Sequence, residues 1–279
     1  MVPTLVKPLI RALVLLAVTM TMTATAQGKV AMMVCHDGGP ASTEQAAPTI
    51  DAFLRHMEKT AGLNAGHLTG SYHNNRTDCV DFMNGDKPVL AVLDLATLLH
   101  HWDSWKLGPM AHMGPADAMR YHVVVKKNGG ATDLTGLAGK SVVSTLAPDQ
   151  AFLESIALGG AAPAGQLQVS HTRRPLKGIR KVARGKADAT VVDQDVMAHL
   201  GELNLPEELT SIYTSEGLPG LTLVEVGINT PDPAMVKKLQ AALSKLCDGD
   251  GQKLCKTFRV QGFVKAQRKR YQSLAKKLR

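Results

Sequence analysis

The sequence predicts an α/β fold, and three observations support it. Short apolar runs alternate with longer stretches that carry apolar residues at helical spacing. Residues 88–95 (PVLAVLDL) are nearly all apolar, as expected of a strand buried on both faces of a parallel sheet. The connections between successive strands are long enough for the crossovers that parallel strands require. With 44% apolar and 20% charged residues, the chain has the composition of a globular protein.

The N-terminal part of the globular region is predicted to alternate between strands and helices. Residues 29–34 predict a strand, and residues 35–48, rich in Gly, Ser, Ala and Pro, predict the loop after it. A helix that ends at Gly62 follows, with its apolar positions at Ile50, Phe53, Leu54 and Met57. The next elements are a helix at residues 77–83, the strand at 88–95 and a short helix at 96–101.

The rest of the chain continues the same alternation. Further strands are predicted at residues 120–126, 166–171, 188–193 and 221–228, and after a helical turn within 132–143. Further helices are predicted from about residue 151, at 179–184, and as two or three helices within 233–279. No internal repeat or low-complexity segment interrupts this pattern.

Residues 1–26 predict a signal peptide. Lys7 and Arg11 give a basic start, residues 12–18 form a compact apolar run, and Ala24-Thr25-Ala26 places small residues before a cleavage at Gln27. The apolar run is too short for a stable membrane-spanning helix, although a retained anchor is the alternative. We therefore expect a protein secreted to the periplasm.

The net charge of +8 comes from one segment. Without Lys7 and Arg11 it is +6, and residues 253–279 hold ten Lys or Arg and no acid, so the rest of the chain carries about −4. A nucleic-acid-binding face would need basic residues spread over a surface with aromatics between them, so no nucleic-acid partner is expected. The basic segment predicts a solvated helix face, with contact to an anionic membrane surface as the alternative.

Four cysteines in an exported chain favour disulfides over metal sites. Three pairings are possible. Cys247 and Cys255 flank a Gly-containing turn and could close a small loop, which would leave Cys35 to pair with Cys79. No Cys or His spacing typical of a zinc site occurs, so neither a metal nor another cofactor is expected.

Several loose motifs occur in a defined order. Residues 133–142 (DLTGLAGKSV) precede a hydroxyl-containing loop and a helix, and residues 182–189 (VARGKADA) precede a strand. Residues 212–220 (IYTSEGLPG) lead into another strand, and Gly262-Phe263 precedes a last helix. In this order the motifs resemble the phosphate/phosphonate-type periplasmic solute-binding proteins of ABC transporters, a branch of the type 2 periplasmic binding protein fold, as a divergent member.

The resemblance implies two lobes joined by a hinge, with mixed, mostly parallel sheets flanked by helices. The chain would cross between the lobes twice, near residues 118–121 and 213–219. Lobe 1 would hold residues 27–118 and 218–279, and lobe 2 residues 119–217. Such a protein is expected to be a monomer that binds a small molecule and delivers it to an ABC permease in the inner membrane. Phosphate, a phosphonate or another small organic solute are the candidate ligands.

Ligands of open parallel sheets bind at the carboxyl ends of the strands. The residues expected to contact the solute are therefore in loops at those ends: His36, Asp94, Ser144, Thr145, Gln150, Asp193 and Thr214. The favoured alternative for Asp94 is that it caps the following helix. Ser144 and Thr145 match the hydroxyl loop of the family. Asp149 departs from that loop and would either repel a phosphate or cap the helix.

An enzyme or a protein-docking subunit on the same fold are the alternatives to a solute-binding protein. Cys35-His36-Asp37 places a thiol beside a possible base, but neighbours in an extended chain point to opposite faces and seldom form a catalytic pair. His100-His101-Trp102 lacks a third metal ligand at matching spacing. No catalytic residue is therefore predicted. A partner or sensor subunit would use the space between the lobes to dock a protein.

Overall fold

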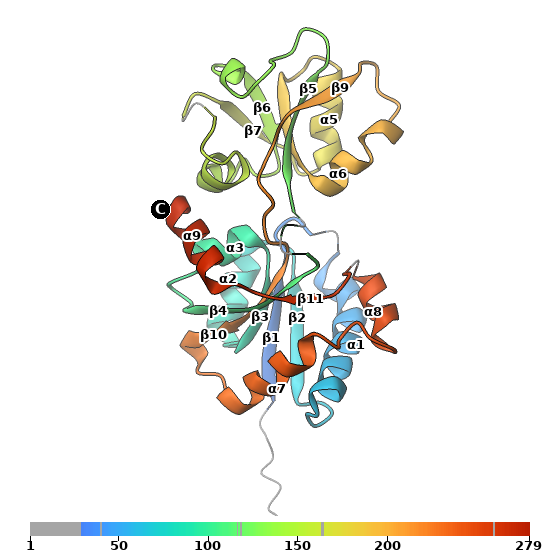
Figure 1. Ribbon diagram of the computed structural model, residues 1–279, viewed down its shortest axis with the longest axis vertical. Coiled ribbons are helices and arrows are strands. Elements are labelled where there is room, and N and C mark those ends of the chain that lie inside the picture. The colour runs from blue at the N-terminus through green and yellow to red at the C-terminus, as the bar shows by residue number, and fades with distance from the viewer. Residues whose placement is uncertain (1–28, 40, 116, 118, 163–164, 259) are drawn as a thin grey trace, which may run out of the picture.

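The protein has two lobes, each built on one mixed β-sheet with helices packed against it (Figure 1). The computed structural model describes residues 29–279 except residues 40, 116, 118, 163–164 and 259. The predicted α/β fold with two lobes is confirmed. The expected signal peptide, residues 1–26, lies outside the described residues.

The first lobe contains a six-stranded sheet in the order β11-β4-β10-β3-β1-β2. Its strands are β1 Val30–Cys35, β2 Leu68–His73, β3 Leu90–Leu93, β4 Leu107–Met113, β10 Thr222–Val226 and β11 Phe263–Lys265. β1 pairs in parallel with both β2 and β3, whereas β10 is antiparallel to β3 and β4. The carboxyl ends of β1 and β3 therefore lie side by side, and both point toward the second lobe (Figure 1).

Six helices cover this sheet: α1 Thr43–Ala61, α2 Arg76–Gly85, α3 Leu95–His100, α7 Pro233–Leu243, α8 Gly251–Thr257 and α9 Arg268–Leu278. The apolar face predicted for α1 packs on one side of the sheet, where Phe53, Leu54 and Met57 join Leu239 of α7 in one core. Gly62 ends α1 with φ of 64°, in the left-handed region that favours glycine.

The second lobe contains a five-stranded sheet in the order β7-β6-β8-β5-β9. Its strands are β5 Tyr121–Lys126, β6 Ser141–Ser144, β7 Gln168–His171, β8 Ala189–Asp193 and β9 Leu209–Thr214. Its helices are α4 Gln150–Phe152, continued by a π-helical turn over Leu153–Ala157, then α5 Pro175–Ala183 and α6 Gln194–Ala198. β6 and β8 are parallel, so their carboxyl ends also lie together, facing the first lobe.

Two antiparallel segments connect the lobes, one between β4 and β5 and the other between β9 and β10. Met119 and Leu218 pair across them, with N···O distances of 3.1 and 2.8 Å in the two directions. Ser215 N donates to Tyr121 O at 2.8 Å and extends the pairing toward the second lobe. The expected boundary at residue 118 falls outside the described residues, so the limits of the lobes stay a prediction.

The predicted loop over residues 35–48 is wrong in its second half, because α1 begins at Thr43. Ser42 caps the helix: its hydroxyl accepts from Gln45 N, while the Gln45 side chain accepts from Ser42 N at 3.0 Å. This capping box supplies partners for two N–H groups at the start of the helix. It stabilises a helix start that continues through Pro48, a residue the sequence analysis assigned to the loop.

Four strands of the structure were not expected from the sequence: β2, β4, β9 and β11. β2, β9 and β11 lie at the edges of their sheets, where half-exposed strands carry polar residues instead of continuous apolar runs. β4 contains Gly108-Pro109, a dipeptide that favours turns. In these cases the pairing with a neighbouring strand decides the local structure.

Both disulfides expected from the sequence are present: Cys35 pairs with Cys79 and Cys247 with Cys255. The first links the end of β1 to α2 beside the hinge. The second links Cys247, before α8, to Cys255 within α8 and closes a short loop. No helix in the described part of the chain combines the length and the apolar character needed to span a bilayer.

The C-terminal helix α9 packs between the lobes, at the left of Figure 1. Its apolar residues Tyr271, Leu274 and Ala275 belong to one hydrophobic cluster with Trp102 of the first lobe and Phe152 of the second. Its basic residues make specific contacts as well. Lys277 pairs with Glu216 at 3.1 Å, Arg279 pairs with Asp103, and the Arg268 guanidinium lies 5.4 Å from the Trp102 ring centroid.

Candidate functional site

The parallel pairing of β1 and β3 brings two carboxylates together at the edge of the first lobe. Asp37 follows β1 and Asp94 follows β3. Asp94 accepts from Asp37 N at 3.1 Å and from Thr97 N at 2.8 Å, and the second bond caps α3. The predicted capping role of Asp94 is therefore present, and the same side chain fixes the loop after β1.

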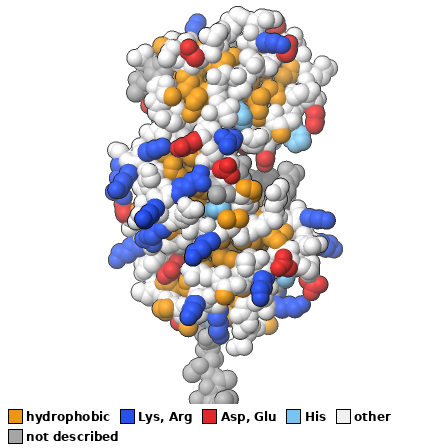
Figure 2. Space-filling model, viewed as in Figure 1, with side chains coloured by type: hydrophobic (Ala, Val, Ile, Leu, Met, Phe, Trp, Pro, Cys, Tyr) orange, Lys and Arg blue, Asp and Glu red, His pale blue; other side chains and the backbone are white. Residues whose placement is uncertain are grey.

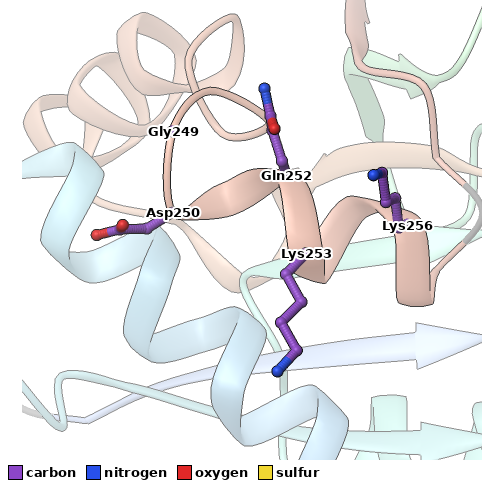
Figure 3. Close-up of a pocket in the computed structure, with 5 residues that line it drawn as sticks. All are labelled: Gly249, Asp250, Gln252, Lys253 and Lys256. Carbon is purple, nitrogen blue, oxygen red and sulfur yellow. The ribbon is translucent and has the colours of Figure 1, made fainter.

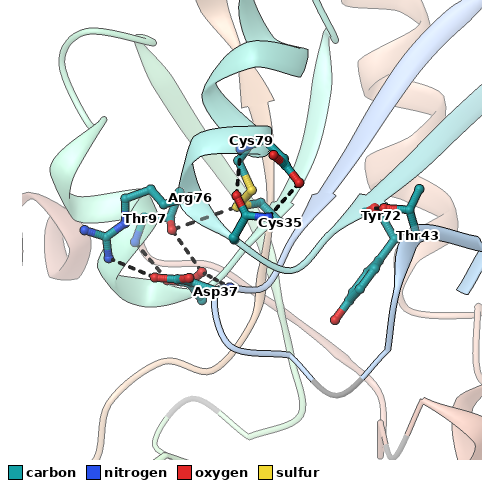
Figure 4. Close-up of a disulfide and its surroundings, with 10 residues drawn as sticks. Cys35, Asp37, Thr43, Tyr72, Arg76, Cys79 and Thr97 are labelled. Atoms are coloured by element: carbon teal, nitrogen blue, oxygen red, sulfur yellow. Dashed lines mark hydrogen bonds and ion pairs between the residues drawn. A yellow bond between two sulfur atoms is a disulfide. The ribbon is translucent and has the colours of Figure 1, made fainter. Parts of the chain in front are cut away.

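Arg76, the first residue of α2, extends toward these carboxylates. Its guanidinium lies 3.6 Å from the Asp37 carboxylate, and the Cys35–Cys79 disulfide lies directly beside this contact (Figure 4). Cys35 is two residues before Asp37, and Cys79 is three residues after Arg76. The covalent link thus fixes the two backbone segments that carry the charged pair.

A carboxylate from the second lobe completes the arrangement. Asp149 precedes α4, and its Oδ2 lies 3.2 Å from Arg76 Nη1 and 2.7 Å from His100 Nε2, while its Oδ1 accepts from Phe152 N at 3.1 Å. Only 9% of Asp149 is exposed. We call Asp37, Arg76, His100 and Asp149 the interlobe cluster. It joins the two lobes through polar and charged side chains. On the face shown in Figure 2, basic and acidic side chains also lie side by side at the narrow middle of the molecule.

The electrostatic environment acts differently on the two carboxylates of this cluster. Burial alone would raise the pKa of Asp149, but the hydrogen bonds from His100 and Phe152 N and the charge of Arg76 bring its pKa below the usual 3.8. Burial raises the pKa of Asp37; the Arg76 charge opposes this rise, and the negative charges of Asp94 and Asp149 add to it. Asp149 is therefore the carboxylate that the cluster holds most firmly in its charged form.

Tyr121 lies near acidic groups contributed by both lobes. Burial raises the pKa of its phenol far above the ordinary value, and the negative charges of Asp94, Asp193 and Asp149 raise it further. Its ring contacts Phe152 edge-on, with 6.0 Å between the centroids. The phenol therefore stays neutral and can serve as a hydrogen-bond donor between the lobes.

The remaining residues expected to bind the solute lie around the same boundary, but most of them have local partners. Ser144 is buried, and its hydroxyl accepts from Leu146 N at 3.0 Å; Asp193 caps α6 through Val196 N at 2.9 Å. Gln150 donates to Glu154 within its own helix at 2.7 Å. Thr214 Oγ1 lies 3.1 Å from His122 Nδ1. Thr145 and His36 are half-buried on the loops after β6 and β1.

Arg76 was missed by sequence reasoning, and His100 was considered as a metal ligand and set aside because no third ligand has matching spacing. The signal for Arg76 is its place at the first turn of a helix directly after a strand, which requires β2 to be recognised. Asp149 was expected to cap its helix or to repel a phosphate. The structure shows the cap, together with the Arg76 guanidinium and the His100 imidazole from the opposite lobe, which the sequence could not reveal.

The two histidines of the sequence His100-His101-Trp102 have different roles. His100 belongs to the interlobe cluster, whereas His101 stacks on Trp105 with ring centroids 3.8 Å apart. Trp102 and Trp105 are buried and pack in the hydrophobic core. The described residues contain no group of three or more His, Cys, Asp or Glu arranged to hold a metal ion. Cys35 is bonded to Cys79, so it offers no thiolate for nucleophilic chemistry.

A surface depression of about 450 Å³ lies elsewhere, against the loop closed by the second disulfide. Its lining residues are Gly249, Asp250, Gln252, Lys253 and Lys256 (Figure 3). The Gln252 and Lys253 side chains extend in opposite directions, and Asp250 is paired with Lys59 at 3.1 Å. Its polar groups thus do not converge on one point, as a binding site requires, and the interlobe cluster is the stronger candidate.

The sequence matches one family model over residues 41–271, that of the ABC transporter phosphonate periplasmic substrate-binding proteins. No curated protein matches the chain significantly.

Solved structures show the same fold at low sequence identity. XAC2383 from Xanthomonas citri, bound to chloride, has a TM-score of 0.68 at 13% identity over 89% of this chain and 97% of its own. PhnD1 from Prochlorococcus marinus, in complex with methylphosphonate, has a TM-score of 0.64 at 13% identity, with 89% and 97% covered. A binding-protein component of an ABC phosphonate transporter from Pseudomonas aeruginosa has a TM-score of 0.59 at 13% identity, with 86% and 82% covered.

The family match covers most of the chain, and the fold and the order of elements agree with it. The chain belongs to the family of phosphonate-type periplasmic substrate-binding proteins of ABC transporters.

Proposed function

We propose that this protein captures a small polar solute between its lobes and delivers it, as a periplasmic monomer, to an ABC permease in the inner membrane. The observation that carries the proposal is the convergence of Arg76 and His100 from one lobe with Asp149 from the other. Charged and polar groups that meet across a hinge can respond to a solute bound between them. The protein itself needs no chemistry for this role.

Phosphate, a phosphonate or another small organic solute are the ligand classes we propose. The family description and the methylphosphonate complex of PhnD1 support the first two. The cluster contains one guanidinium and one imidazole, groups that bind oxyanions through charge-assisted hydrogen bonds. The neutral Tyr121 phenol adds a hydrogen-bond donor for a polar solute.

A thermal-shift screen tests this function. The purified protein is heated with phosphate, phosphite, phosphonates, sulfonates, amino acids and polyamines at increasing concentrations. A ligand that binds only the folded form raises Tm as its concentration rises. We expect a saturable shift with one class that is lost in Arg76→Ala and kept in Asp232→Asn, a change at an exposed helix cap in the first lobe.

Docking of a protein partner is the second candidate. It is favoured by the contacts that already close the boundary between the lobes, namely the interlobe cluster and the hydrophobic cluster shared by Trp102, Phe152 and Leu274. A well-folded sample that shows no thermal shift with any solute class would support this candidate and contradict the first.

A further inference from the structure

Asp149 has the surroundings of a bound anion. Three donors reach its carboxylate: Arg76 Nη1 at 3.2 Å, His100 Nε2 at 2.7 Å and Phe152 N at 3.1 Å. Two of these donors come from the opposite lobe, and both contact the same oxygen, Oδ2. A phosphate or phosphonate oxygen would use the same kinds of donor, a guanidinium, an imidazole N–H and a backbone N–H.

We infer that Asp149 is a built-in substitute for the anionic group of a solute. Its carboxylate occupies the position that Arg76 and His100 form for an oxyanion, holds the lobes together without a solute, and lowers the affinity for free oxyanions. Asp149 would thereby determine the specificity of the site. The inference rests on the proposed function, because it assumes that solutes enter between the lobes.

Charge balance around Arg76 supports this assignment. Arg76 lies between two carboxylates, with Asp149 at 3.2 Å and Asp37 at 3.6 Å. An incoming oxyanion would have to displace Asp149 from Arg76 or sit next to its negative charge, and either event costs binding free energy. When Asp149 is neutralised, Arg76 retains one carboxylate partner and regains capacity for an anion.

The other charged groups near the site do not replace Asp149. Asp94 is held by Asp37 N and Thr97 N on its own lobe, and Asp193 by Val196 N on the other. Tyr121 stays neutral. Asp149 is thus the carboxylate in this group that contacts a guanidinium and an imidazole from the opposite lobe.

The test compares the protein with its Asp149→Asn variant. Asparagine keeps an oxygen that can accept from Phe152 N but removes the charge. Titration calorimetry with sodium phosphate and with methylphosphonate measures affinity, and small-angle X-ray scattering without ligand measures the radius of gyration. We expect the variant to bind an oxyanion at least about tenfold more tightly than the parent protein, because the competing internal contact is gone. We also expect a larger radius of gyration that shrinks when the anion is added.

Three further variants make the result specific. Asp149→Ser keeps a capping hydroxyl and provides a second neutral variant if Asp149→Asn folds poorly. Arg76→Ala combined with Asp149→Asn should lose the gain in affinity. Asp133→Asn is the matched control, because Asp133 accepts from Gly136 N at 2.9 Å on an exposed turn of the same lobe. It should leave affinity and radius of gyration unchanged.

Equal oxyanion affinity and equal radius of gyration in the parent protein and the neutral variants would overturn the inference. If the parent protein binds a solute and the variants leave that affinity and the lobe spacing unchanged, the inference fails while the proposed function stands. If the variants gain phosphate binding while the parent protein binds none of the screened solutes, the inference is supported and the proposed function of solute delivery is contradicted.

Discussion

Arg76 Nη1 lies 3.2 Å from Asp149 Oδ2, so the first residue of α2 in one lobe touches the residue before α4 in the other. The two residues are 73 positions apart in the chain. The disulfide beside Arg76 and the helix cap at Asp149 hold both ends of this contact in place. The boundary between the lobes is therefore closed by a charged contact as well as by apolar packing.

The charged state of Asp149 should make stability depend on pH. Its folded pKa lies below the ordinary 3.8, so the stability it contributes is fully present above that value and is lost as pH falls through the folded pKa. We expect Asp149→Asn to lower the free energy of unfolding by about 1.5–3 kcal/mol at pH 7, because hydrogen bonds to a charged group are lost. Urea unfolding from pH 7 down to pH 2 should show this difference shrinking at the acid end. A difference that stays constant over the range would contradict the assignment.

His101 should stay neutral well below neutral pH. Burial lowers its pKa to about 4 from the ordinary 6.5, and the nearby positive charges of His100 and Arg76 act in the same direction. The unfolded chain then binds more protons between these two values, so this residue makes stability fall as pH drops from 6.5 toward 4. NMR titration of the imidazole should give a midpoint near 4, and His101→Phe should reduce the pH dependence of unfolding in that window. A midpoint near 6.5 would show that the ring is solvated and not stacked on Trp105.

The two disulfides should contribute unequally to stability. The Cys35–Cys79 bridge spans 44 positions and the Cys247–Cys255 bridge spans 8. A longer closed loop removes more entropy from the unfolded chain, which corresponds to about 4 kcal/mol for the first bridge and about 2.5 kcal/mol for the second. Urea unfolding of the two double Cys→Ser variants should reproduce this order. The variant without the first bridge should also lose the solute-induced thermal shift, because Arg76 and Asp37 are no longer fixed relative to each other. A larger loss in the Cys247/Cys255 variant would reverse the expected order.

Tyr271 should be a principal anchor of the C-terminal helix. Its ring is 1% exposed, lies 6.4 Å from the Trp102 ring and parallel to it within 3°, and its hydroxyl is 3.0 Å from Thr222 Oγ1. Tyr271→Phe removes only the hydrogen bond and should cost about 1 kcal/mol. Tyr271→Ala also leaves a cavity and should cost about 3–5 kcal/mol. Tryptophan fluorescence during urea unfolding measures both, with exposed Lys269→Ala as a neutral control. Similar losses for Phe and Ala would contradict the packing role.

Much of the fold could be predicted from the sequence where a strand is buried on both faces. β3 is a continuous apolar run and β8 is rich in Ala and Val, and both were predicted close to their observed limits. The edge strands β2, β9 and β11 were missed. Each has a neighbouring strand on one edge only, and each mixes polar and apolar residues. The start of α1 was misplaced because the capping residues Ser42 and Gln45 lie in a stretch whose composition favours a loop.

The candidate site was predicted only in part, for a related reason. The strand ends predicted Asp94, Asp193 and Ser144, but in the structure these side chains accept hydrogen bonds from backbone N–H groups of the loops and helix starts around them. Their ligand contacts stay a prediction. Arg76 and His100 lie on short helices at the edge of the first lobe, and no local pattern marks them as partners of a residue in the second lobe.

The sequence by itself determined the α/β class, the buried strands, the helix caps at Asp94 and Asp149, and the pool of cysteines from which two bridges form. These features depend on composition and on residues close together in the chain, where propensity and periodicity act. The tertiary structure alone decided that Arg76 and His100 meet Asp149 across the lobes, at separations of 73 and 49 positions. Such a contact depends on the path of the whole chain through both sheets and on the closure of the hinge. The free energy that orders these side chains therefore comes from tertiary packing between residues that are far apart in the sequence.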